Sequence, residues 1–314
     1  MPTLYAIVLA LLGFGLAASP VSAITYTFND VKVPGSFSTS ALGINTPGQV
    51  VGWFTNSVGG FHGFLLSNGS YTTLDYPGAP NTLASDINDS GEIVGYYDDG
   101  ITIHGFTLIN GQYTAFDYPG AANTYAFGVN KTGQIVGYYF DQNNKIHGYK
   151  FSGGVFTAIN VPHATQTQPF GINSTGHISG IFNDATGEHG FLIRNGTVQT
   201  LDVPEAVGAT GAAGLNDKDL VVGTYTDPSI QKVEGFLTNE VKYLTIKDPN
   251  GTTTFPSGIN NKNVIVGTYF DSFGNEMSFT ATPQLPMKDR GARNTTGHVS
   301  PASARHPGRT GVIF

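Results

Sequence analysis

A short segment that ends in asparagine and runs into a tight turn recurs six times along this chain. The anchors of the pattern lie 42 to 44 residues apart and are Asn45, Asn88, Asn130, Asn173, Asn216 and Asn260. A fixed period of this length is the signature of a repeat architecture, in which each copy is one supersecondary unit. The sequence therefore predicts six equivalent structural units in one array.

Each repeat contains four segments that are rich in β-branched and aromatic residues and are separated by turn signals. The Asn turn is followed by runs such as QVVGWF and EIVGYY, then by a polar loop and a segment that opens with His-Gly-Phe in most copies. The third and fourth segments meet at turns such as Asn68-Gly69, which favour a type I′ hairpin. Four antiparallel strands per repeat, with no helical periodicity, are typical of a propeller blade.

The sixth copy explains how the array closes. No fourth segment follows Phe279 in that copy, whereas residues 26–34 (YTFNDVKVP), ahead of the first anchor, have the pattern of a fourth strand without a repeat of their own. Pairing the two would remove an exposed strand edge at the seam. The predicted fold is an all-β six-bladed β-propeller over residues 24–282, with its last blade completed by the N-terminal strand. A parallel β-helix is the alternative, but its coils are shorter and lack paired hairpin turns.

The two ends of the chain differ from the repeats. Residues 1–23 combine an apolar run with a Val-Ser-Ala ending, which predicts a cleaved signal peptide and a secreted protein, extracellular or periplasmic. No later segment is apolar enough to span a membrane. Residues 283–314 are polar, rich in proline and basic, and are expected to form a disordered tail. The chain has no cysteine, so disulfides cannot stabilise it.

Charge is distributed unevenly between these parts. Residues 24–282 carry 10 basic and 21 acidic side chains, net −11, whereas residues 283–314 carry 5 and 1, net +4, which together give the overall −7. Binding of nucleic acid depends on neutralising phosphates with Lys and Arg. An acidic body without a basic stripe argues against a nucleic-acid partner, and a monomer is expected.

The repeated motifs carry a resemblance to a known family. The combination G-I-N-x-x-G-x-I-V-G-x-Y, H-G-F and D-x-P-G-A, spread over residues 28–279, resembles the HAF family of probable extracellular repeats. The resemblance implies a bacterial exported protein of propeller type, without an established chemistry. Family members often end in a sorting signal with a hydrophobic helix, and the polar tail of this chain departs from that pattern.

Four histidines open the third segment of consecutive repeats, namely His62, His104, His147 and His189. Equivalent positions on neighbouring blades lie about 10 Å apart, whereas a shared metal requires each ligand nitrogen within about 2.1 Å. We therefore expect structural residues, half-buried and donating to a loop carbonyl, and no metal or cofactor. The six Asn anchors are likewise expected to be structural.

Two other sets of residues are candidates for ligand binding. The first is a row of loop carboxylates that would form an acidic rim on one face, attractive to cations or a basic partner: Asp99, Asp141, Asp184, Asp227 and Asp271. Their alternative role is that of ordinary turn residues. The second set consists of departures from the repeat. Asp86 replaces an inner-strand glycine and should point toward the central channel, and His163 and Glu205 replace the glycine of the P-G-A loop.

Signatures of catalysis are sparse in the sequence. There is no cysteine and no G-x-S-x-G elbow, so no nucleophile stands out. The sequence favours a secreted non-catalytic binding or scaffold propeller that engages a glycan, a peptide or an envelope protein through the loops of one face. The alternatives are a glycan-acting hydrolase or lyase that uses a channel carboxylate such as Asp86, and a purely structural protein of the envelope or matrix.

Overall fold

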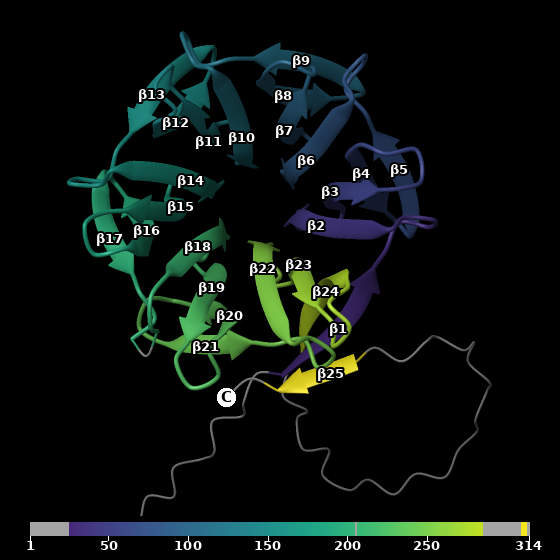
Figure 1. The fold of residues 1–314 in the computed structure, drawn as a ribbon, viewed down its shortest axis with the longest axis vertical. Helices are drawn as coiled ribbons and strands as arrows, with labels where there is room; N and C mark the ends of the chain where they lie inside the picture. Colours follow the sequence, from purple (N-terminus) through teal and green to yellow (C-terminus); the bar gives the residue numbers. More distant parts are fainter. Residues whose placement is uncertain (1–24, 205, 285–308, 313–314) are drawn as a thin grey trace, which may run out of the picture.

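The computed structural model describes residues 25–204, 206–284 and 309–312, and the elements in these ranges are strands. Six antiparallel sheets stand in a ring around a central channel, which confirms the predicted six-bladed β-propeller (Figure 1). The region holds no helix long and apolar enough to cross a membrane. The predicted signal peptide lies outside the described residues.

Five blades are each made of four consecutive strands, with the first strand innermost. Blade one contains β2 (Ser38–Ile44), β3 (Val50–Thr55), β4 (His62–Ser67) and β5 (Ser70–Leu74). Blade two contains β6 (Asn81–Ile87), β7 (Ile93–Asp98), β8 (Ile103–Ile109) and β9 (Gln112–Phe116). Blade three contains β10 (Asn123–Val129), β11 (Ile135–Phe140), β12 (Ile146–Ser152) and β13 (Val155–Ile159). Blade four contains β14 (Gln166–Ile172), β15 (Ile178–Asn183), β16 (Glu188–Arg194) and β17 (Thr197–Leu201). Blade five contains β18 (Thr210–Leu215), β19 (Val221–Asp227), β20 (Lys232–Thr238) and β21 (Tyr243–Ile246).

Blade six joins the two ends of the chain. Its first three strands are β22 (Thr253–Ile259), β23 (Ile265–Phe270) and β24 (Glu276–Gln284), and β1 (Thr25–Val31) supplies the fourth. β1 runs antiparallel to β24, with Phe28 opposite Ala281. The Phe28 ring is buried and lies 5.3 Å from that of Phe279. The predicted closure by the N-terminal strand is confirmed.

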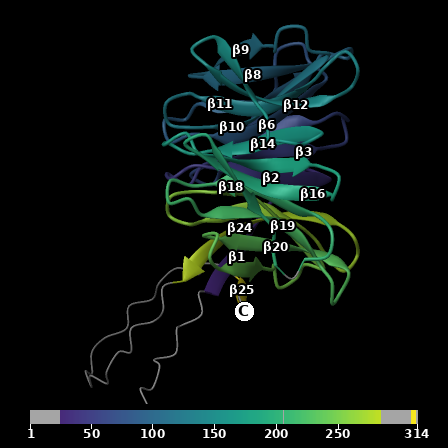
Figure 2. The ribbon, with the colours of Figure 1, turned by 90° about the vertical axis from the view of Figure 1, so that its left-hand side faces the viewer.

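The C-terminal tail differs in part from expectation. β24 continues to Gln284, two residues beyond the predicted boundary, and Arg309–Val312 form β25, which pairs antiparallel with β1 on the outer edge of blade six (Figure 2). The unpaired edge of β1 offers main-chain donors and acceptors that a further strand can use. Residues 309–312 of the predicted tail thus extend the last sheet to five strands, and residues 285–308, 313 and 314 lie outside the described residues.

A β-bulge interrupts the innermost strand of every blade and explains a repeated glycine on the second strand. In blade one the register shifts between Ala41 and Gly43, and the bulge brings the carbonyl oxygen of Ser40 against Gly52. A side chain at Gly52 would collide with this oxygen, and the same holds for the glycine of each I-V-G segment. Glycine is required there because two backbones approach closely.

The six Asn anchors form a closed ring of hydrogen bonds between neighbouring blades. Each side-chain amide donates to the main-chain carbonyl of the next anchor, with donor–acceptor distances of 2.9 to 3.2 Å. The side-chain oxygen accepts from main-chain N–H groups of its own turn, as Asn130 does from Thr132 and Gln134. Each anchor thus shapes its own turn and ties its blade to the next.

A second sixfold set was not singled out from the sequence. Six buried threonines near the start of the inner strands accept a hydrogen bond from the loop that precedes them, at 2.9 to 3.3 Å: Thr39, Thr82, Thr124, Thr167, Thr210 and Thr254. These contacts fasten the connection between consecutive blades and hold the loops that surround the channel.

Candidate functional site

The channel opens on two faces that differ in chemistry. We call the face that carries the Asn turns and the hairpins between third and fourth strands the turn face. The opposite face, which carries the loops after the second and fourth strands, is the loop face. Because the inner strand of each blade runs from the loop face to the turn face, its early residues line one opening and its late residues line the other.

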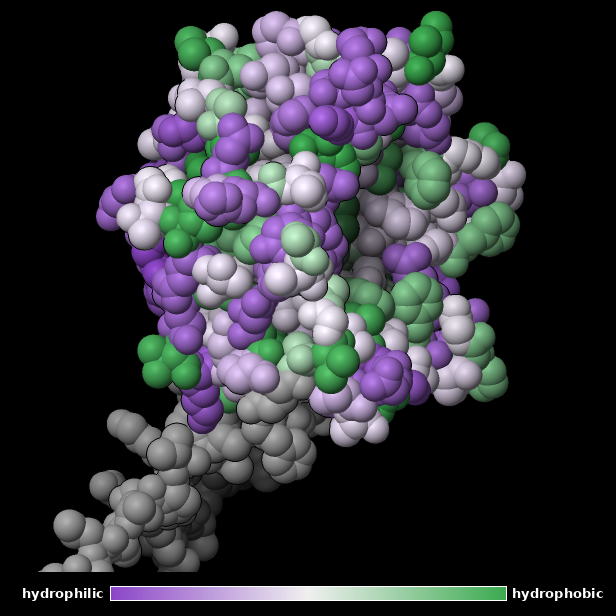
Figure 3. All heavy atoms as spheres, turned by 60° about the vertical axis from the view of Figure 1, so that its left-hand side comes forward, coloured by the Kyte–Doolittle hydropathy of each residue, from purple (hydrophilic) through white to green (hydrophobic). Residues whose placement is uncertain are grey.

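A hollow of about 400 Å³ lies on the loop face beside the channel. Its floor is formed by blade five, at Gly211, Ala213 and Thr224, and its walls include Phe170 from blade four and Phe255 from blade six. Figure 3 shows the molecule hollowed near its centre, where the channel opens toward this face. We call this depression the loop-face hollow. Its volume falls within the range of small-molecule sites.

The hollow forms at blade five because its inner strands carry small residues where blade three carries aromatic ones. In blade three, the positions equivalent to the floor are occupied by stacked aromatic rings. Tyr125 lies 5.0 Å from Tyr138 across the two inner strands, and Phe127 lies 5.1 Å from Tyr138. Blade five carries Gly, Ala and Thr at these three positions, and Gly211 pairs with Thr224 as Tyr125 pairs with Tyr138. The missing side-chain volume leaves the hollow open.

The lining of the hollow combines apolar walls with a few polar groups. Phe170, Phe255 and Phe270 supply aromatic surface, and hydroxyl groups come from Thr224, Ser257 and Thr268. Of the described lining residues, Glu188 alone is charged, and it sits half-buried at the start of β16. Apolar walls with a small number of convergent polar groups are the usual composition of a binding site.

The predicted acidic rim is engaged in the structure of its own loops. Asp99 accepts from the main chain of Ile101 and Thr102, at 2.8 Å each, and its second oxygen lies 3.3 Å from His104 Nε2. Main-chain N–H groups of their own loops also bond to Asp141, Asp184, Asp227 and Asp271. The main-chain N–H of Lys145 also donates to Asp141, and this bond, more than those with His147 and Asn143, lowers the pKa of the Asp141 carboxyl. The geometry matches the alternative reading, in which these residues shape turns.

The repeated histidines bind carboxylates, so the expected donation to a loop carbonyl is wrong. Nδ1 lies 2.9 to 3.0 Å from an aspartate at the end of the fourth strand of the same blade in three pairs, His62–Asp75, His104–Asp117 and His189–Asp202. His147 instead reaches the loop residue Asp141, 3.2 Å from Nε2. In blade five the charges of the pair are reversed: Glu234 stands at the histidine position and accepts a hydrogen bond from Lys247, at the aspartate position, over 2.7 Å. No group of three or more His, Cys, Asp or Glu within the described ranges could hold a metal.

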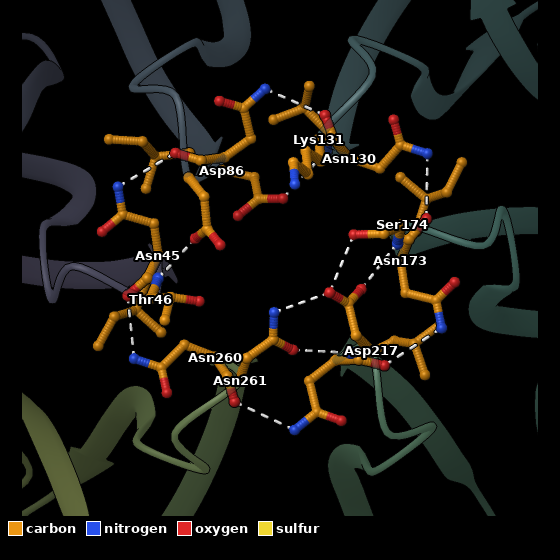
Figure 4. A pocket seen from close by; sticks show the side chains of 18 of the residues that line it. Asn45, Thr46, Asp86, Asn130, Lys131, Asn173, Ser174, Asp217, Asn260 and Asn261 are labelled. Atoms are coloured by element: carbon orange, nitrogen blue, oxygen red, sulfur yellow. Dashed lines mark hydrogen bonds between the residues drawn. The ribbon is translucent and has the colours of Figure 1, made fainter.

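The turn-face opening is polar and narrow. The residues that follow the Asn anchors surround it, and the opening has a volume of about 80 Å³ (Figure 4). The Asp217 carboxylate accepts from Ser174 and from the Asn261 side chain, at 2.8 to 2.9 Å, so it joins blades four, five and six. We call this the turn-face mouth, and its rim is held by hydrogen bonds between blades.

Asp86 projects into the channel below this mouth, as predicted (Figure 4). Oδ2 accepts from the main-chain N–H of Val129, 3.0 Å away in the next blade. Desolvation by the surrounding channel wall raises the pKa of Asp86 to about 7, and the nearby Asp89 charge adds to the rise. Its side chain keeps partial exposure to the lumen, so water in the channel can reach it and moderate the desolvation.

The three predicted departures do not form one site. His163 is exposed in the turn from Val161 to Ala164 on the loop face and takes the left-handed backbone conformation (φ 66°) that glycine has at the equivalent Gly78 and Gly120. Glu205 lies outside the described residues. The loop-face hollow was missed, although the small residues in T-G-A-A-G-L, where blade three has T-Y-A-F-G-V, were a signal in the sequence.

Comparisons with known proteins bear on the fold. No family model and no curated protein matches the chain. A mutant Aleuria aurantia lectin in complex with Fucα1-6GlcNAc is similar over 80% of this chain and 97% of that chain, at 12% identity and a TM-score of 0.50. The fucose-specific lectin from Aleuria aurantia is similar over 80% of this chain and 96% of that chain, at 13% identity and a TM-score of 0.50. Putative TolB from Agrobacterium tumefaciens is similar over 82% of this chain and 97% of that chain, at 12% identity and a TM-score of 0.50. At these identities, the likeness shows the propeller fold alone.

Proposed function

We propose that this protein is a non-catalytic binding propeller that takes a glycan in its loop-face hollow. The observation that carries the proposal is the hollow itself, about 400 Å³ of space opened by small residues on blade five and walled by Phe170 and Phe255. A sugar ring has an apolar C–H face and a polar edge of hydroxyl groups. The aromatic walls can pack against the apolar face of the sugar, and Glu188 and the surrounding hydroxyl groups can form hydrogen bonds with its hydroxyl edge.

The lectins with a similar fold support the idea that a six-bladed propeller can serve as a glycan-binding scaffold, since one of them is described as fucose-specific. Sequence identity of 12 to 13% carries no residue of their sites to this chain. The aromatic and polar lining of the hollow is therefore what favours a glycan. A peptide or an envelope protein is the other class of partner that the test below separates.

The proposal is tested on a glycan array, followed by titration calorimetry with the best-binding saccharide. The informative variant is Ala213→Phe, which places an aromatic ring where blade three has Phe127 and so fills the hollow. Ala115→Phe, on the exposed outer strand β9, is the matched control. We expect at least a tenfold loss of affinity for Ala213→Phe and unchanged affinity for Ala115→Phe.

A second variant distinguishes a loss of binding from a loss of folding. Glu188→Gln keeps the size of the side chain and removes its charge, so it should weaken binding while leaving the melting temperature close to that of the original protein. Equal affinity in the original protein, Ala213→Phe and Glu188→Gln would overturn the proposed site. An empty array together with capture of an envelope peptide would overturn the choice of glycan.

Asp86 is not proposed as a catalytic residue. The cavity beside it has a volume of about 50 Å³, which is room for a few water molecules. A polysaccharide chain would need far more space around the reacting carboxylate. The geometry thus favours binding in the loop-face hollow over hydrolysis in the channel.

We further propose, from the repeated motifs and the N-terminal pattern, that the protein is exported and is of the HAF type. The chain expressed with its N-terminus intact should be recovered outside the cytoplasm with residue 24 as its new first residue. Recovery of the uncleaved chain in the cytoplasm, shown by N-terminal sequencing, would contradict export.

A further inference from the structure

The inner strand of blade two departs from the other five at a position that lines the channel. Where Asp86 stands, the other blades carry Gly43, Gly128, Gly171, Gly214 and Gly258. Glycine suits this place because neighbouring inner strands approach closely: a side chain on Gly214 would meet Gly258, and one on Gly43 would meet Asp86. Blade two alone places a carboxylate there, so the channel carries one negative charge that the repeat does not require.

The neighbouring residue, Ser85, has a hydroxyl without a partner among the described residues. It lines the same cavity, is only 5% exposed, and its Oγ makes no hydrogen bond. The equivalent Ser257 of blade six donates to the main-chain carbonyl of Ala41 in the next blade, at 2.8 Å. A buried hydroxyl that lacks a partner costs free energy, so Ser85 is an unsatisfied polar group next to Asp86 in the sequence.

The cavity beside these two side chains is small and has a mixed lining. Its volume is about 50 Å³, and Ser85, Asp86, Ser257 and three glycines line it together with apolar residues such as Phe127 and Phe170. The next blade's main-chain carbonyl lies against several of these glycines, as that of Ser257 does at Gly214. Carboxylate, hydroxyl and carbonyl oxygens are the ligands preferred by hard cations.

We propose that the channel beside Ser85 and Asp86 binds one monovalent cation, of the size of Na⁺ or K⁺. A single carboxylate among neutral oxygens balances a single positive charge, and the described residues contain no cluster of three acidic or histidine side chains that would suit a divalent metal. Rings of main-chain carbonyls hold such cations in channel proteins by replacing their hydration shell. The site lies nearer the turn face than the loop-face hollow, with which it shares the lining residues Leu42, Phe170 and Ser257.

Other charges face Asp86 from the turn-face mouth. Asp89 and Asp217 are acidic, and Lys131 is basic, so the mouth adds one net negative charge to that of Asp86. No salt bridge between Asp86 and a basic side chain is found among the described residues. Asp86 therefore has no basic partner among these residues to balance its charge, and a bound cation would supply that balance.

The direct test uses Rb⁺, a scatterer that substitutes for K⁺. Crystals of the full chain grown at pH 8 and soaked in RbCl should show an anomalous peak within about 3 Å of the Asp86 carboxylate. Asp86→Gly restores the residue found in the other five blades, and its crystals should lack the peak. A peak that persists in Asp86→Gly, or an empty channel in the original protein at pH 8, would overturn the proposal.

A solution measurement gives a second reading. Melting temperatures in NaCl or KCl, compared with choline chloride at the same ionic strength and pH 8, should rise in a saturable manner for the original protein, because a ligand bound only by the folded state stabilises it. Asp86→Gly and Asp86→Asn should show no difference between the salts. Equal melting temperatures in all three salts for the original protein would indicate that a proton or water alone satisfies Asp86.

Discussion

The side-chain amide of Asn260 donates a hydrogen bond to the main-chain carbonyl of Asn45, 2.9 Å away, although 215 residues separate them. This bond crosses the seam between the last and the first blade, and it has the same form as the bonds between consecutive anchors elsewhere in the ring. On the turn face the seam is thus indistinguishable from any other blade junction. The ring of amides and the strand β1 close the propeller at two separate places.

Asn260→Ala should lower the free energy of unfolding by about 2 kcal/mol or more, because it removes this bond and leaves the Asn45 carbonyl and the N–H groups of Lys262 and Val264 without their partner. Chemical denaturation monitored by fluorescence measures the loss. Asn143→Ala, in an exposed loop, is the control and should change stability by less than about 0.5 kcal/mol. Equal effects of the two variants would show that the ring contributes nothing.

Phe28→Ala tests closure at the other end of the seam. Phe28 is 1% exposed and packs on Phe279, so truncation should cost about 3–5 kcal/mol. Phe37→Ala removes a ring that is 73% exposed and should leave the melting temperature nearly unchanged. Deletion of residues 24–34 should go further and abolish the cooperative thermal transition, as followed by calorimetry. A deletion variant as stable as the original protein would contradict closure by β1.

Lys247→Ala should destabilise the protein by about 2–3 kcal/mol, because Glu234 is 2% exposed and would keep a buried charge without its partner. The charges in this pair are the reverse of the histidine–aspartate pairs in other blades. The double variant Glu234→His with Lys247→Asp rebuilds the arrangement of His189 and Asp202, and it should recover most of the stability that Lys247→Ala loses. Failure of the double variant to recover stability would show that the pairs are not interchangeable.

The histidine pairs make stability depend on pH. Although burial opposes it, hydrogen bonds and charges from Asp117 and Asp99 raise the pKa of His104, and Asp202 and Asp184 do the same for His189. A histidine whose pKa is higher in the folded than in the unfolded protein stabilises the fold when it is protonated. This contribution is fully present below about pH 6.5 and is lost as the pH rises through the folded pKa. The fall should be modest, since solvent screens the half-exposed aspartates.

Calorimetry between pH 6 and pH 9 measures this effect in the Asp86→Gly background. Asp86 must be absent because its own titration also changes stability with pH. Its raised pKa lowers the stability of the fold as the pH rises from about 4 to about 7. Replacing His104 and His189 by Gln should flatten the curve above pH 6.5. A curve of unchanged slope would mean that other groups cause the pH dependence.

Much of the architecture could be predicted because it depends on local sequence patterns that recur in every blade. The Asn-to-Asn spacing fixed the number of blades, the Asn-Gly turns marked the hairpins, and the unpaired segment around Phe28 identified the closing strand. Each of these depends on backbone conformation within a few residues. Asp86 could also be placed in the channel, because its position in the repeat is that of an inner-strand glycine.

The sequence by itself determined the repeat, the order of the strands and the seam, since these follow from the conformational preferences of short segments. The tertiary structure alone decided which groups meet across blades. It supplied the aspartate partners of the histidines, bound the expected rim carboxylates into their own loops, and opened the loop-face hollow beside Phe170 and Phe255. The reason is physical: a cavity is the volume that side chains from several blades fail to fill, and no single repeat contains that sum.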